Sequence, residues 1–180
     1  MNNQLRFKEI QDSEIGSAAA LIVNEEGKVL AFARDGNPNN LGLIAGSRER
    51  DPISHKFNES PFECMHRELR EELITSDLDK KIQVKPSDFI FEEEPIYVAK
   101  PQDDHPYCAT YMVKYIGSQK YFPIIFYHED SYIEDSKVII TKLEGYAMWV
   151  DPKDIISNEM SAFKEYNTEL LRIAGLIKEM

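Results

Sequence analysis

The chain has 180 residues, of which 42% are hydrophobic, and its formal net charge is −11. This length and apolar content suffice for one compact domain over residues 1–180 with a hydrophobic core, and they exclude a disordered chain. The strong negative charge argues against general binding to nucleic acids or to anionic membranes, but it leaves small phosphorylated substrates open if a metal reverses the local field.

The cysteines and the N-terminus bear on the cellular compartment. Cys64 and Cys108 are the only cysteines, and no spacing typical of a metal site connects them. Two free thiols suit a reducing interior. The stretch from Met1 to Arg6 lacks an apolar signal core, and no segment approaches membrane-spanning length. We therefore expect a cytoplasmic protein.

The first part of the chain predicts strands. Residues 17–23 form a short apolar run that is typical of a buried strand, and residues 28–34 alternate as a second strand after a turn. Residues 41–45 predict a short strand that ends at a glycine. The stretch 47–58 follows as a long loop, and a loop of this length inside a compact domain is often functional.

Residues 60–74 predict one amphipathic helix. Ser60 is a favourable N-cap, Pro61 suits the first helical position, and Glu63 completes a capping box. A stripe at helical spacing is expected to face the core: Phe62, Met65, Leu69 and Leu73.

The same helix carries acids on a neighbouring stripe. They are spaced three and four residues apart: Glu68, Glu71 and Glu72. Carboxylates at this spacing lie close together and repel one another. Mg2+ takes oxygen ligands and would remove the repulsion. In an acidic protein, however, such a face is usually only solvated.

The second half of the chain predicts further strands and a terminal helix. The expected strands are residues 89–91, 96–99, 109–116, 121–127, 137–142 and 146–150. Residues 160–177 repeat apolar side chains at helical spacing, which predicts an amphipathic helix. Together these elements predict an α/β fold of the α+β type, with a mixed β-sheet between helices.

The residues around the acidic stripe favour a specific site over a solvated face. Glu59 lies eight residues before Arg67, and Arg67 is followed by Glu68, an aliphatic residue and then Glu71 and Glu72. With this composition, such a pattern arises by chance in about one chain in a hundred.

This pattern resembles the box of the Nudix hydrolase family, G-x5-E-x7-R-E-U-x-E-E-x-G-U, where U is aliphatic. Glu59 and the run from Arg67 to Glu72 match it without a gap, and Gly46 resembles its first glycine. The chain departs from the box in three ways. Twelve residues instead of five separate Gly46 from Glu59, Ala45 stands where a glycine is common, and Ile74 stands in place of the late glycine.

The resemblance implies a Nudix-like α/β/α sandwich and a Mg2+-dependent hydrolase, with Mn2+ as the alternative ion. Such an enzyme cleaves the diphosphate linkage of a nucleoside diphosphate that is joined to another group. The implied metal ligands and catalytic residues are Glu68, Glu71 and Glu72. The implied supporting residues are Gly46, Glu59 and Arg67. An ion pair between Glu59 and Arg67 would tie the loop to the helix and set the carboxylate geometry.

The resemblance also implies a general base in a loop far along the chain. Metal-bound carboxylates are poor bases, because the cation stabilises their charged form. We expect Glu144 to be the base, since it lies just before the last predicted strand and Gly145 would let the backbone turn close to the site. Glu129 and the run 92–94 are alternatives.

The long loop and several aromatic residues are candidates for substrate contacts. Arg48 and Arg50 lie on the loop 47–58, where cations near a diphosphate would be useful, although a solvated excursion is the alternative. The aromatic candidates for base stacking, which are more often core residues, are Tyr97, Tyr107, Tyr121, Phe122 and Tyr127.

Two other classes of protein remain alternatives to the hydrolase. One is a catalytically weak Nudix-fold nucleotide-binding or regulatory domain, and the other is an unrelated acidic interaction domain. The intact glutamate triplet favours the enzyme. We expect a small nucleotide-type substrate, no membrane and no general nucleic-acid partner, with a homodimer left open.

Overall fold

The computed structural model describes residues 10–34, 37, 41–74, 84–119, 122–127, 132–134, 137–139, 143–157 and 164–178. The strands are β1 (Ile15–Val23), β2 (Val29–Arg34), β3 (Leu41–Gly42), β4 (Ile44–Ser47), β5 (Phe89–Ala99), β6 (Tyr107–Tyr115), β7 (Ile124–Tyr127), β8 (Tyr132–Glu134), β9 (Lys137–Ile139) and β10 (Leu143–Val150). The helical elements are η1 (Asp12–Glu14), α2 (Pro61–Leu69), η2 (Arg70–Ile74), η3 (Pro86–Asp88), α3 (Pro152–Ser157) and α4 (Lys164–Ile173). Within the described residues, no helix has the length and apolar character needed to span a membrane.

Most strands belong to one mixed sheet. Its hydrogen-bonded order is β5-β6-β1-β2-β10-β7, while β3 pairs with β2 and β4 pairs with β1. β1 runs parallel to β6 and antiparallel to β2 and β4. β8 and β9 form a separate two-stranded sheet. The predicted mixed sheet is therefore confirmed.

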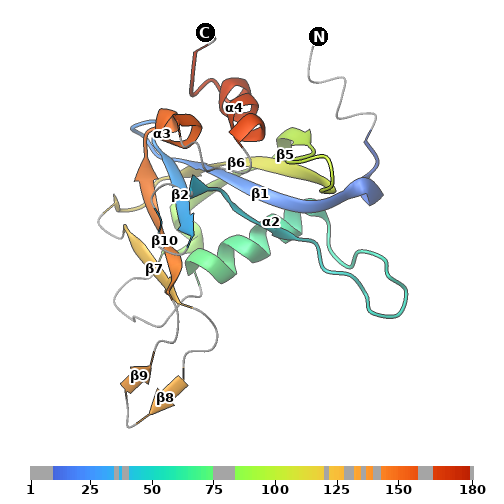
Figure 1. The fold of residues 1–180 in the computed structure, drawn as a ribbon, viewed down its shortest axis with the longest axis horizontal. Coiled ribbons are helices and arrows are strands. Elements are labelled where there is room, and N and C mark those ends of the chain that lie inside the picture. Colours follow the sequence, from blue (N-terminus) through green and yellow to red (C-terminus); the bar gives the residue numbers. More distant parts are fainter. Residues whose placement is uncertain are drawn as a thin grey trace.

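Helices cover both faces of the sheet. Figure 1 shows α2 on one side of the sheet and α3 and α4 on the other. The buried side chains of β1 divide accordingly, since Ala18, Ala20 and Ile22 pack on the α2 side. Ala19 and Leu21 pack on the α4 side. A strand that is buried on both faces is apolar throughout, which explains the continuous apolar run. The predicted sandwich is confirmed.

The start of α2 is set by local sequence. Ser60 Oγ accepts the backbone N–H of Glu63 at 3.2 Å, and Glu63 Oε2 accepts the backbone N–H of Ser60 at 2.7 Å. Pro61 occupies the first turn, where a missing N–H costs nothing. Met65 and Leu69 are buried against the sheet. The predicted capping box and core stripe are thus confirmed.

The predicted helix over 60–74 is present, but its geometry changes near the C-terminal end. The α-helix stops at Leu69, and Arg70–Ile74 form a π-helix. A glycine at position 74 would favour a left-handed end of the helix, whereas this conformation is strained for the β-branched Ile74, which instead belongs to the π-helix. Leu73 stays buried at 2% exposure, so the wider turn preserves the core contact.

The sequence predicted two strands, 89–91 and 96–99, separated by the acidic run 92–94. The structure has no break there. Phe89–Ala99 form one strand that lies at the edge of the sheet. The register with β6 shifts between Phe91 and Pro95 and again between Pro95 and Tyr97. The glutamates at 92–94 are exposed there, since an edge strand tolerates charges and irregular pairing.

The helices and strands in the last third of the chain have different bounds from those predicted. The predicted helix 160–177 corresponds to α4, and the shorter α3 precedes it. Of the predicted strand 137–142, the structure describes residues 137–139, which form β9. Its partner strand β8 was not predicted. The predicted strand 146–150 is confirmed within the longer β10.

Candidate active site

A glycine of β4 and a glutamate of α2 are in close contact. Gly46 pairs with Ala18 of β1, and this pairing places β4 beside the helix. A Cβ atom added to Gly46 would lie 1.8 Å from Oε1 and 1.9 Å from Cδ of Glu68. The thiol of Cys64 also donates to the Gly46 carbonyl, with Sγ 3.6 Å from the oxygen. Only glycine at position 46 leaves room for the Glu68 carboxylate where it lies.

Arg67 of α2 connects the residues around this contact. Its Nε and Nη2 groups donate to the two carboxylate oxygens of Glu59 at 3.2 and 2.9 Å. Its Nη1 group donates to Glu68 Oε1 at 2.8 Å and to Glu71 Oε2 at 3.1 Å. Nη2 also donates to the carbonyl of Ser47 at 2.9 Å. The predicted ion pair between Glu59 and Arg67 is present, and it joins the end of the long loop to the helix.

The carboxylates that share Arg67 differ in their electrostatic environment. Partial burial opposes the ionisation of Glu59, but hydrogen bonds from Arg67 and from the backbone of Glu49 hold the pKa of Glu59 below its ordinary value. Burial raises the pKa of Glu68, and the charge of Glu71 adds to this rise against the opposing effect of Arg67. The guanidinium of Arg67 therefore does not fully offset the effects of burial and of the neighbouring carboxylates on Glu68. A further cation beside Glu68 would stabilise its ionised form.

The donors at this place suit a hard divalent cation. They are carboxylate oxygens, which Mg2+ and Mn2+ prefer. Glu68 and Glu71 both contact the same nitrogen of Arg67, so their carboxylates are neighbours. Glu72 is half-buried on the widened turn.

The glutamates do not yet have the arrangement of a metal site. In the described stretches, no three acidic, histidine or cysteine side chains already surround one point. Arg67 lies between Glu68 and Glu71, and the π-helix changes the angular spacing that the sequence predicted for Glu72. The residues fit the ion in chemistry and charge. A shared ion would require Glu71 and Glu72 to turn towards Glu68.

The candidates for the general base are described to different extents. Glu144 lies in β10, which pairs with β2 and β7, so it belongs to a strand and not to the predicted loop. The Glu144 side chain and all of Glu129 lie outside the described residues. On the edge strand β5, Glu92 Oε1 lies 3.9 Å from Lys114 Nζ at the exposed surface. The assignment of Glu144 as the base stays a prediction.

Arg48 lies inside the protein, although the sequence predicted a substrate contact for it. The residue is 6% exposed. Its guanidinium donates to the carbonyls of Asp12 and Ile15, both at 2.8 Å, and to the carbonyl of Glu59. A substrate contact through this guanidinium would require these bonds to break. No local pattern indicates these partners, because Asp12 and Ile15 lie 36 and 33 residues away in the sequence.

The stretch 47–58 is ordered by its own contacts. Arg50 and Phe57 form a backbone bridge, and Arg50 Nη1 donates to the carbonyl of His55 at 2.9 Å. The guanidinium carbons of Arg48 and Arg50 lie 4.0 and 3.9 Å from the centre of the Phe57 ring. Figure 1 shows this segment between β4 and α2 projecting beyond the sheet. Arg50 is exposed, so its predicted substrate contact stays open.

The aromatic candidates for base stacking lie at different places. Tyr97 packs against Tyr166 of α4, with ring centres 5.1 Å apart. Phe122 packs against Trp149 and Tyr115 on the face of the sheet that carries α2, with ring centres 5.0 and 5.5 Å away. Tyr107 is half-buried, while Tyr121 and the side chain of Tyr127 lie outside the described residues.

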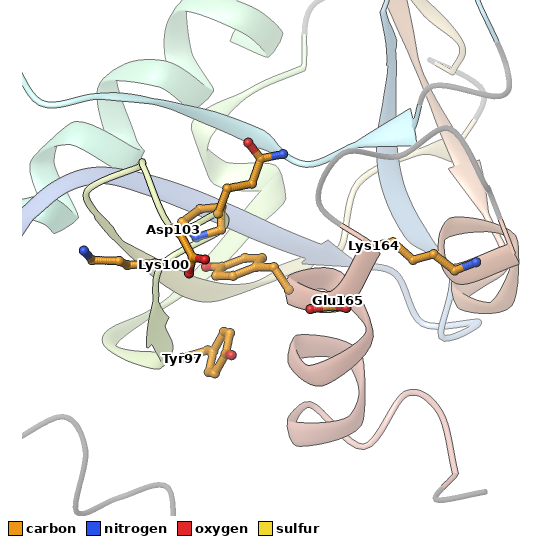
Figure 2. Close-up of a pocket in the computed structure, with 8 residues that line it drawn as sticks. Tyr97, Lys100, Asp103, Lys164 and Glu165 are labelled. Atoms are coloured by element: carbon orange, nitrogen blue, oxygen red, sulfur yellow. The ribbon is translucent and has the colours of Figure 1, made fainter.

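A pocket lies on the other face of the sheet. It has a volume of about 530 Å³ and is lined by the end of β5, the residues after it and the start of α4. Figure 2 shows Tyr97, Lys100 and Asp103 on one wall and Lys164 and Glu165 on the other, with the two lysines extending away from each other. Its charged groups do not converge on one point, unlike those around Arg67. We therefore place the candidate active site at α2.

Comparisons with known proteins give matches among solved structures only. No family model and no curated protein matches the chain. A Nudix hydrolase from M. smegmatis is similar with a TM-score of 0.49 and 12% identity, over 92% of this chain and 89% of that chain. A MutT protein from Methanosarcina mazei is similar with a TM-score of 0.47 and 17% identity, over 91% and 96% of the two chains.

A hydrolase of the Nudix family from Clostridium perfringens has a TM-score of 0.44 and 16% identity, over 90% of this chain and 97% of that chain. A Nudix hydrolase from Nitrosomonas europaea is a further structural neighbour, so the family recurs among the similar structures. At these identities and TM-scores the likeness assigns no activity. The chemistry is therefore argued from the residues of this chain.

Proposed function

We propose that this chain is a Mg2+-dependent hydrolase of the Nudix type, which cleaves the diphosphate linkage of a nucleoside diphosphate joined to another group. The contact between Gly46 and Glu68 supports this most strongly, because a merely solvated acidic face would have no need for a glycine at that place. The other residues that match the box and gather around this contact are Glu59, Arg67 and Glu71.

In this proposal, Glu68, Glu71 and Glu72 hold the ion, with Mn2+ as the alternative to Mg2+. The bound ion supplies positive charge to a phosphate oxygen and lowers the pKa of a water. Glu59 and Arg67 orient the helix carboxylates, since the guanidinium contacts both sides of the site. Such supporting contacts commonly change metal affinity or activity by about 10- to 100-fold when they are lost.

The remaining roles are assigned by chemistry. Glu144 would accept the proton of the attacking water, because a carboxylate that does not bind the ion keeps its basicity. The exposed guanidinium of Arg50 would contact a substrate phosphate. We extend the proposal to one catalytic domain over residues 1–180, which acts in the cytoplasm on a small nucleotide-type substrate.

The test is hydrolysis of a panel by the purified full chain. The panel holds nucleoside triphosphates, nucleotide sugars, dinucleoside polyphosphates and dinucleotide cofactors, each with Mg2+, with Mn2+ and with EDTA. We expect products of diphosphate cleavage that require the ion and disappear in Glu72→Gln. Nucleotide binding without turnover by the wild type would instead favour the alternative, a catalytically weak nucleotide-binding domain.

A further inference from the structure

We propose that Arg48 is a positioning residue of the candidate active site. It fastens the backbone in front of α2 to the start of β1, and through Glu59 it sets the place of Arg67. The proposal rests on the proposed function of this site, and it assigns to Arg48 a role other than the substrate contact that its charge suggested.

The donors of Arg48 are all used inside the protein. Nε and Nη2 donate to the carbonyl of Glu59, and Nη1 donates to the carbonyls of Asp12 and Ile15. Nη2 also donates to Asp12 Oδ2, which lies 3.0 Å from the nitrogen. These contacts engage the five N–H groups of a guanidinium, whose planar fork suits such an arrangement. The backbone of Arg48 also donates to the Gly16 carbonyl at 2.9 Å, which ties the same residue to β1.

Glu59 connects the hydrogen bonds of the Arg48 guanidinium, which we call the Arg48 clamp, to the candidate active site. Arg48 holds the Glu59 carbonyl, and the Glu59 carboxylate accepts both Arg67 and the backbone N–H of Glu49, the latter at 2.8 Å. Arg67 then contacts Glu68 and Glu71 through Nη1. The Glu59 side chain is only 12% exposed, so little freedom remains between the clamp and the guanidinium.

The long loop explains why such a clamp is needed. Twelve residues separate Gly46 from Glu59, so the chain alone does not fix the distance between β4 and the start of α2. Arg48 is the second residue of this stretch and bonds to Glu59 at its far end, which closes the loop at its base. Phe57 stacks on the guanidinium at 4.0 Å and covers it.

The test compares Arg48→Lys with Leu170→Ala in the full chain. Lysine keeps the charge but cannot reproduce the fork. Leu170 is fully buried on the α4 side, away from the site, so its truncation destabilises the fold without touching the clamp. Rates are measured below the melting temperatures of both variants. We expect Arg48→Lys to lower kcat by about 10- to 100-fold and to weaken Mn2+ binding by a similar factor, with KM nearly unchanged.

A spectroscopic readout makes the test independent of turnover. The Nε–H of Arg67, which donates to Glu59 Oε2, gives its own NMR signal, and this is assigned by its absence in Arg67→Lys. Hydrogen exchange of this group should be about tenfold faster or more in Arg48→Lys, and unchanged in Leu170→Ala. The kcat losses of Arg48→Lys and Glu59→Gln should also be less than additive in the double variant, because both act through one residue.

Each readout can overturn the proposal. An unchanged Arg67 signal in Arg48→Lys, or additive losses in the double variant, would show that Arg48 does not act through Glu59. A rise in KM at wild-type kcat would assign Arg48 to substrate binding instead. If the wild type hydrolyses no member of the panel, the proposed function fails, while the Arg67 signal still decides the role of Arg48.

Discussion

Replacement of Gly46 by alanine tests whether catalysis depends on the position of the Glu68 carboxylate. The new Cβ would lie 1.8 Å from Oε1, and ordinary contacts begin at 3.4 Å, so the oxygen must retreat by about 1.6 Å. The atoms that move are the end of a flexible side chain. The fold should tolerate this, with a fall of about 1 kcal/mol or less in the free energy of unfolding.

The effect on turnover should be much larger. Bonds from Mg2+ to oxygen are about 2.1 Å long and tolerate little variation, so a carboxylate displaced by this much loses its place among the ligands. The retreat also breaks the contact of 2.8 Å between Glu68 Oε1 and Arg67 Nη1. A misplacement of about 1 Å near reacting groups costs about 100-fold. We expect kcat to fall by at least that factor.

The matched control is Gly42→Ala. Gly42 lies four residues earlier in β3, and a Cβ there would have no heavy atom within 4 Å. Gly42→Ala restricts the backbone of the unfolded chain in the same way as Gly46→Ala, but it introduces no steric clash in the folded protein. The assay measures kcat and KM at saturating Mg2+, Mn2+ affinity and urea unfolding for both variants. If Gly46→Ala kept the kcat and the Mn2+ affinity of the wild type, the assignment of Glu68 as a ligand would be refuted.

Three further predictions concern other parts of the site and its helix. Glu71→Gln or Glu72→Gln should each lower Mg2+-dependent kcat by about 100-fold or more while the melting curve is preserved, and near-wild-type rates in both would reject the site. Glu144→Gln should lose about 10²- to 10⁴-fold in kcat, partly recovered at alkaline pH as hydroxide replaces the base, whereas a slow Glu129→Gln beside a fast Glu144→Gln would move the role to Glu129. The hydrogen bond from the Ser60 backbone lowers the pKa of Glu63 from its ordinary 4.5, so the stability that Glu63 adds over Glu63→Gln should be present above that pH and vanish as the pH falls through the lowered value, which urea unfolding at several pH values checks.

The features that the sequence predicts correctly are local ones. The capping box needs only Ser60 and Glu63, which lie within one turn. The apolar run of β1 and the stripe of α2 follow from periods of two and of 3.6 residues. The ion pair between Glu59 and Arg67, which the resemblance to the box implied, joins residues only eight positions apart.

The features that the sequence does not predict depend on distant residues. Arg48 looks like a surface cation in a polar loop, and its burial follows only from the meeting of that loop with η1 and the start of β1. The glutamates at 92–94 look like a break in a strand. They are tolerated because β5 lies at the edge of the sheet, which is a property of the whole topology and not of the segment.

The arrangement around Arg67 divides the candidate site into a fixed part and an adjustable part. Glu59 and Glu68 are 12% and 14% exposed in their side chains, whereas Glu71 is 56% exposed. An exposed carboxylate gains little from an ion pair with arginine, on the order of 1 kcal/mol or less, because water screens the charges. The ion pair with Arg67 would therefore only weakly oppose the proposed binding of a divalent cation to Glu71, while Glu68 would keep its place against Gly46. In such a site the carboxylate of Glu68 would already be in place before the ion binds, and the more exposed carboxylate of Glu71 would move to complete the ligand set.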